Sequence, residues 1–337
     1  MRPARLLAGL LLLGACTGDL NGGNPGRESG APDATADTAG SGGDAHGQTE
    51  RPIKSDGPGA KDSTSPGAPR FFRANSLWNT PIASEPVKWA DQAGLRSGSW
   101  WVNWDSYSNP VVLGSASDPV VSVTVPASWG WPAGGLKVHV PSGVTGASGT
   151  DASLVVIDGS TVYDFWQFSR SSNTAASASS YAQSDIVQGS GWGSSSPQKG
   201  AGIRAAGSSG LAGEIYGDEL TQGIHHALAF AATSAAGLDG PSRPPAISGD
   251  GPAEGTRVGI PPGTAKPGNL SVQGGRTWDA LQTYGAWLVD RTSGGSPCVF
   301  NADPRSVSQA DVDALLGDLD KITPALRVVV YDYPYDP

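Results

Sequence analysis

The sequence is poor in cysteine, in positive charge and in long apolar runs. Its 337 residues include only two cysteines, Cys16 and Cys298, and 22 Lys and Arg stand against 31 Asp and Glu. The net charge of -9 and the lack of a basic patch argue against nucleic acid as a partner. The apolar run Leu6–Leu13 is too short to span a bilayer, which takes about 20 apolar residues.

The first sixteen residues have the pattern of a secretory signal. Arg2 and Arg5 precede the apolar run, and small residues follow it. The segment Leu13-Gly14-Ala15-Cys16 resembles the end of a bacterial lipoprotein signal. This resemblance implies that residues 1–15 are removed, that Cys16 is lipidated, and that the protein is extracytoplasmic, attached to a membrane of the cell envelope through this lipid alone. The alternative is an ordinary secreted protein with a chance cysteine.

The segment 16–69 contains no Phe, Trp or Tyr and is rich in Gly, Pro, Ser, Thr, Ala, Asp and Glu. Such a composition cannot bury enough apolar surface to offset the entropy of ordering the chain. It therefore predicts a disordered tether. All the aromatic residues lie in the segment 70–337, which is long enough for one large domain. We expect a single globular domain there.

Short runs rich in Val and aromatic residues predict that this domain is mainly β, either a β-sandwich or a jelly roll. Asp158-Gly159, between two such runs, predicts a tight hairpin. The candidate strands are Trp100–Trp104, Val111–Leu113, Val120–Val125, Leu136–Val140, Leu154–Ile157, Val162–Phe168, His226–Ala231, Arg257–Ile260, Ala286–Val289 and Leu326–Tyr331.

Two short helices are expected, at Trp278–Tyr284 and at Ser308–Lys321, with the Ser308 side chain as the N-cap of the second. The stretches 171–200 and 235–275 are rich in small residues and are predicted to be long loops. Cys298 lies in a strand-like run, so we expect its thiol to be buried.

Eleven tryptophans suggest platforms for sugar rings, although Trp also fills β-sandwich cores. Trp192 lies between two glycines in a Ser-rich stretch and is the best candidate for an exposed ring. Together with Trp166, Gln167 and Tyr284 it forms the predicted substrate-binding set. Asp164 would share a strand face with Trp166, which suits acid–base work on a sugar. The alternative is a carboxylate that is hydrogen-bonded to a neighbouring loop.

A second candidate group lies between residues 200 and 230, where Arg204, Glu214 and His226 could supply a charge clamp, an acid and a base. His226 is either a core histidine or a base tuned toward neutrality. On a strand, His225 and His226 would point to opposite faces, so a shared metal is not expected. No cofactor is predicted either. The predicted catalytic set is Asp164, Glu214, His226 and Arg204.

Five segments resemble an uncharacterised family of secreted bacterial proteins. They are Ser76-Leu77-Trp78-Asn79-Thr80-Pro81-Ile82, Tyr163-Asp164-Phe165-Trp166-Gln167, Gly202-Ile203-Arg204-Ala205, Glu219-Leu220 with Gly223-Ile224-His225-His226-Ala227-Leu228, and Leu281-Gln282-Thr283-Tyr284-Gly285-Ala286-Trp287-Leu288-Val289-Asp290. The family has no established activity, so the resemblance implies one shared domain and no mechanism. Its usual histidine is the second of the pair, preceded by an acid, which favours His226.

These observations lead to two hypotheses about function. The first is a surface-anchored carbohydrate-active protein that cleaves a polysaccharide. A glycoside hydrolase would use two carboxylates, whereas a lyase would use His226 or Tyr284 as a base and Arg204 to neutralise a uronate. The second is a non-catalytic carbohydrate-binding or envelope-structural lipoprotein. Both have a polysaccharide or cell-envelope glycan as the partner. Convergence of the ionisable groups in a cleft beside an exposed Trp would favour the enzyme.

Overall fold

A computed structural model describes residues 71–82, 87–97, 99–126, 134–193, 202–293 and 298–331. The predicted signal peptide, the lipidation site Cys16 and the predicted tether lie outside these residues. Among the described segments, no helix combines the length and the apolar character needed to cross a membrane.

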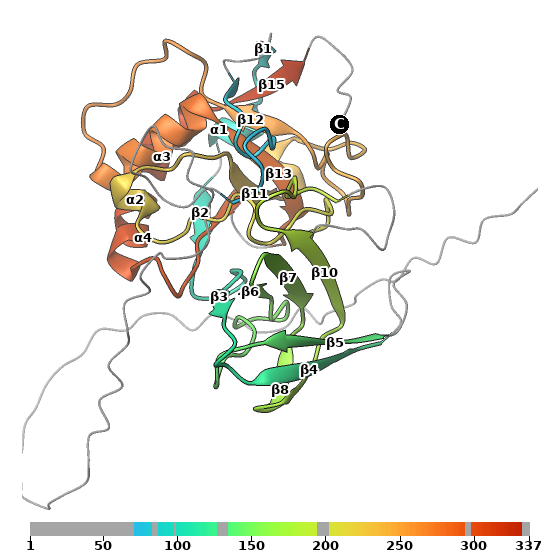
Figure 1. Ribbon diagram of the computed structural model, residues 1–337. Coiled ribbons are helices and arrows are strands. Elements are labelled where there is room, and N and C mark those ends of the chain that lie inside the picture. Colours follow the sequence, from blue (N-terminus) through green and yellow to red (C-terminus); the bar gives the residue numbers. More distant parts are fainter. Residues whose placement is uncertain are drawn as a thin grey trace, which may run out of the picture. The chain divides into compact units, whose positions relative to one another are not determined.

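Fifteen strands in three sheets dominate the described residues, which confirms a mainly β fold (Figure 1). The largest, here called the central sheet, is mixed: β13 pairs in parallel with β11 and β14 with β2, and the other pairs are antiparallel. The order of its strands is β1 (Val87–Ala90), β15 (Arg327–Tyr331), β12 (Arg257–Gly259), β13 (Ala286–Arg291), β11 (Leu228–Ala232), β14 (Cys298–Asn301) and β2 (Trp100–Asn103).

Two four-stranded sheets complete the β structure. The inner sheet has the order β10 (Ser180–Asp185), β7 (Thr161–Trp166), β6 (Leu154–Asp158) and β3 (Val111–Gly114). The outer sheet has the order β5 (Gly134–His139), β4 (Val120–Val125), β9 (Ala175–Ser177) and β8 (Ser169–Ser172).

The helices are short, and a serine N-cap explains where two of them begin. They are α1 (Ala93–Ser97), α2 (Glu219–Gln222), α3 (Val272–Thr283), α4 (Gln309–Leu316) and α5 (Leu319–Ile322), with 3-10 turns η3 (Ser234–Ala236) and η4 (Thr323–Ala325). Helix α3 begins earlier than predicted because the Ser271 hydroxyl accepts a hydrogen bond from Gly274 N. The Ser308 cap is confirmed, since its side chain accepts from Asp311 N. The predicted second helix is divided between α4 and α5.

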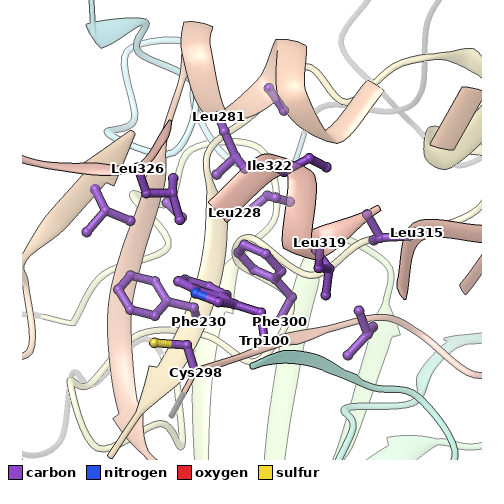
Figure 2. Close-up of a cluster of buried hydrophobic side chains, with 14 of the residues drawn as sticks. Trp100, Leu228, Phe230, Leu281, Cys298, Phe300, Leu315, Leu319, Ile322 and Leu326 are labelled. Carbon is purple, nitrogen blue, oxygen red and sulfur yellow. The ribbon is translucent and has the colours of Figure 1, made fainter. Parts of the chain in front are cut away.

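Three apolar cores lie between the layers and pack them together. The first lies between the central sheet and helices α3–α5. Figure 2 shows part of this cluster, in which Trp100 lies next to Phe300 and the buried Cys298, and Leu281, Leu315 and Leu319 come from the helices. The second joins the central sheet to the inner sheet, and the third fills the sandwich between the inner and outer sheets. Each fully buried large side chain contributes about 1.5–3 kcal/mol.

Strand β6 illustrates how the sequence specifies this layering. Its continuous apolar run has Leu154 and Val156 in the sandwich core, whereas Val155 and Ile157 enter the core shared with the central sheet. A strand covered on both faces needs apolar residues at every position. Strand β4 instead alternates exposed and buried residues, because one of its faces meets solvent.

The predicted hairpin is confirmed: β6 and β7 pair antiparallel, and Gly159 takes the positive φ of 64° that the turn requires. Three other predictions need correction. The expected loop 171–200 contains β9 and β10. Strand β7 ends at Trp166, because Gln167 has a φ of 56° and leaves the extended conformation. Strand β11 begins only at Leu228, so His226 precedes it and does not alternate with Leu228 on one strand face.

Candidate functional site

Asp164 on β7 is completely buried and points to a loop of the same domain. Its Oδ2 accepts a hydrogen bond from Ser209 Oγ at 2.8 Å, and its Oδ1 accepts from Gly210 N at 2.6 Å. A Cβ at residue 210 would lie 2.8 Å from that Oδ1, so the close approach requires glycine. Burial raises the pKa of Asp164 to about 7. This value suits a general acid, but the carboxyl group is closed off from solvent.

Arg204 and Glu214 form an ion pair next to this contact. Arg204 Nη2 lies 3.0 Å from Glu214 Oε2 and also donates to the carbonyl oxygen of Gly210 at 3.0 Å. The amide of Asn109 donates to the same Glu214 oxygen at 3.2 Å. Burial raises the pKa of Glu214, whereas the charge of Arg204 and the hydrogen bonds from Asn109 oppose the rise.

Gly210 therefore joins three of the four predicted catalytic residues into one buried network. Its N–H group bonds to Asp164, and its carbonyl oxygen bonds to Arg204, which pairs with Glu214. All three side chains are at most 6% exposed. Buried polar groups of this kind are stabilising when they are hydrogen-bonded, as the Nη2 atom of Arg204 is. The Nε atom of Arg204 is also buried, and it has no hydrogen-bond partner among the described residues. Asp164 thus makes the hydrogen bonds to a neighbouring loop that the alternative interpretation of this carboxylate expects.

His226, the fourth predicted catalytic residue, pairs with Glu219 at the start of α2. Its Nε2 lies 3.0 Å from Glu219 Oε1, and its Nδ1 lies 2.9 Å from the carbonyl oxygen of Ala227. A carbonyl oxygen only accepts, so Nδ1 carries a hydrogen. The contact between His226 Nε2 and Glu219 Oε1 also needs a hydrogen between its two atoms, and this hydrogen is bonded either to Nε2 or to Oε1. The two side chains are 11% and 2% exposed, so this proton is shielded from bulk water.

A small cleft adjoins His226. Its volume is about 10 Å³, which is about the room for one water molecule. The walls are mostly aromatic and come from two segments, residues 71–79 and the loop 211–213. His226 is thus the predicted catalytic residue that borders a cleft, and it is separate from the buried network around Gly210.

The predicted substrate-binding residues do not form one exposed platform. Trp192 is only 7% exposed, because its ring stacks on Trp78 at 5.0 Å and meets Trp287 edge-on at 5.8 Å. Tyr284 is buried in the same core. Trp166 and Gln167 are half-buried, and Gln167 Oε1 accepts from Ser179 Oγ at 2.6 Å. The expected exposure of Trp192 is therefore wrong.

Several residues that complete these arrangements were missed by the sequence analysis. Asn109 and Ser209 supply hydrogen bonds across large separations in the chain, and nothing in their local sequence signals it. Asp290 is a further group whose pKa is raised to about 7, chiefly by burial.

Within the described ranges, no group of three or more His, Cys, Asp or Glu side chains is placed to hold a metal ion.

Comparisons with known proteins add no relative: no family model, no curated protein and no solved structure matches the chain.

Proposed function

We propose that this protein is an extracytoplasmic lipoprotein that binds a polysaccharide or cell-envelope glycan without cleaving it. The observation that carries the proposal is the closed network of Asp164, Arg204 and Glu214. In this account a lipid on Cys16 holds the chain at a membrane, since two acyl chains suffice for stable anchoring. The domain following the tether supplies the binding surface.

The chemistry of glycoside cleavage explains why this network argues for binding. A hydrolase needs two carboxyl groups on either side of the scissile bond, one of which transfers a proton to the leaving oxygen. Asp164 and Glu214 are buried, and their oxygens already accept from Ser209, Gly210 and Arg204. A substrate could reach them only by breaking these contacts, which leaves buried charges without partners.

The experiment is a combined binding and cleavage assay on the full-length protein. Neutral and acidic polysaccharides are immobilised, bound protein is quantified, and the same samples are assayed for reducing ends and for the absorbance of unsaturated uronates. We expect saturable retention on at least one glycan and no product of either kind. Retention on none of the glycans, or product that accumulates with time, would refute the proposal.

Polysaccharide cleavage is the second candidate, and the pairing of His226 with Glu219 favours it, because a carboxylate that orients an imidazole is typical of a catalytic base. Here His226 would transfer the proton in a hydrolase or a lyase, and Glu219 would orient the ring. His226→Gln and Glu219→Gln would then abolish product formation, whereas the neighbouring His225→Gln would retain it. Equal activity in all three variants would exclude this route.

The predicted membrane localisation can be tested separately. Mass spectrometry of protein from a bacterial envelope should find an acylated Cys16 as the first residue, and Cys16→Ala should release the protein from the membrane fraction. An unmodified Cys16 in protein that is not membrane-bound would refute the predicted lipid anchor, and the description of the fold would still hold.

A further inference from the structure

A shallow hollow opens at the edge of the outer sheet, away from the residues discussed so far. Its volume is about 320 Å³, within the range of small-ligand sites. One wall is the loop 143–145, and the other consists of the end of β8 and the turn that follows it, residues 170–173.

Arg170 holds the two walls together. Its Nη1 donates to the carbonyl oxygens of Pro141 at 2.7 Å and Val144 at 3.3 Å. Nη2 donates to Asn173 O at 3.0 Å and, at 3.5 Å, to the carbonyl of residue 140, while Nε donates to that of residue 172 at 3.0 Å. A guanidinium group has five N–H donors, and all five are used here. The hollow is therefore fixed in shape before any ligand arrives, which lowers the entropic cost of binding.

The chemistry of the lining selects the ligand. Because its donors are all used, Arg170 has none left for a bidentate contact with a carboxylate or sulfate. The exposed side chains of Thr145 and Asn173 offer a hydroxyl and an amide, which both donate and accept hydrogen bonds. Sugar hydroxyl groups have this same dual character. The chain's net charge of -9 further disfavours a polyanion.

We propose that this hollow binds a neutral sugar unit of a polysaccharide, with Thr145 and Asn173 as its direct contacts. The inference rests on the proposed glycan-binding function and names the site and the ligand class. The hydroxyl groups of Ser171 and Ser172 form hydrogen bonds within the protein. Ser171 Oγ donates to Ala175 O at 3.1 Å, and Ser172 Oγ accepts from Thr174 N at 3.2 Å. They shape the turn that presents Asn173.

The test measures the affinity of the full-length protein for neutral glucan, xylan and mannan oligosaccharides and for acidic uronate oligosaccharides. The site variant is Thr145→Ala with Asn173→Ala. The matched control, Thr264→Ala with Asn269→Ala, removes the same two side-chain types from the loop before α3. Thermal melting checks that both variants fold. We expect the site variant to bind neutral oligosaccharides at least tenfold more weakly, and the control to bind like the wild type.

The outcomes separate the inference from the function on which it rests. Wild-type protein that binds no oligosaccharide of either class refutes glycan binding itself. If the wild type binds and the site variant binds equally well, the hollow is not the site, although the binding function stands. Binding restricted to acidic oligosaccharides overturns the neutral ligand class.

Discussion

Arg204 and Glu214 form an ion pair inside the domain, with Nη2 3.0 Å from Oε2 and side chains that are 4% and 0% exposed. The pair shares Gly210 with Asp164, so the ionisable residues that most resemble an active site hold two segments of the fold together. Their energetic role can be measured.

Arg204→Met should destabilise the protein strongly. It leaves Glu214 in the interior without its charge partner, and breaking a buried pair in this way costs about 3–5 kcal/mol. The exposed pair of Arg96 and Asp91, 2.7 Å apart, is the control, because Arg96→Met should cost about 0–1 kcal/mol. Denaturant unfolding of both variants gives the comparison. Equal, small losses would contradict the structural role of the buried pair.

Stability should fall as the pH rises from about 4 to about 7. Burial raises the pKa of Asp164 to about 7, so between about pH 4 and pH 7 the folded state holds a proton that the unfolded chain has released. The stabilising contribution is complete below the unfolded pKa and disappears as the pH passes the folded one. For Asp164 the shift corresponds to a free energy on the order of 4 kcal/mol.

The variant Asp164→Asn tests the assignment, because an amide does not titrate. The decline in unfolding free energy with pH should be shallower in this variant than in the wild type, as measured by denaturation at several pH values. Parallel profiles would mean that Asp164 is not the titrating group, and a wild-type stability that rises over this range would reverse the predicted sign.

Trp192 should behave as a core residue. Trp192→Ala removes a ring stacked on Trp78 and should cost about 3–5 kcal/mol. Trp101→Ala removes a ring that is 50% exposed, and we expect a much smaller loss. If Trp192→Ala melted like the wild type but lost glycan binding, Trp192 would be a ligand platform instead.

The two cysteines give a test of both burial and lipidation. Cys298 is fully buried, and burial raises its pKa to about 12, so its thiol should not react in the native protein. In denaturant, one thiol per chain should react with Ellman's reagent, because an acylated Cys16 has no free thiol. Two reactive thiols would contradict lipidation, and a reactive native thiol would show that at least one cysteine is accessible.

Apolar patterning made most of the sheet structure predictable. Val120–Val125 alternates and Leu154–Ile157 does not, and both became strands whose burial matches their pattern. Strand β10, Ser180–Asp185, was missed because its residues are mostly polar. It is held by its backbone pairing with β7, and Ala182 is its one buried side chain. Backbone pairing of this kind leaves no apolar periodicity in the sequence.

The residue types of the candidate site were predictable from the sequence, but their burial inside the domain was not. The sequence predicts acid–base chemistry at Asp164, Arg204 and Glu214, and the fold brings these three residues together. Glu214 also accepts a hydrogen bond from Asn109, which is 105 residues away in the chain. The pairing of His226 with Glu219 joins the segment just before β11 to the first residue of the short helix α2. Neither contact follows from local spacing.

The most direct test of the account is the molar mass of a neutral polysaccharide during prolonged incubation with the full-length protein, followed by size-exclusion chromatography with light scattering. We predict that the polysaccharide co-elutes with the protein and that its own mass does not change. A mass that falls with time, and stops falling when His226 is replaced by Gln, would show that the protein is an enzyme and would contradict the account.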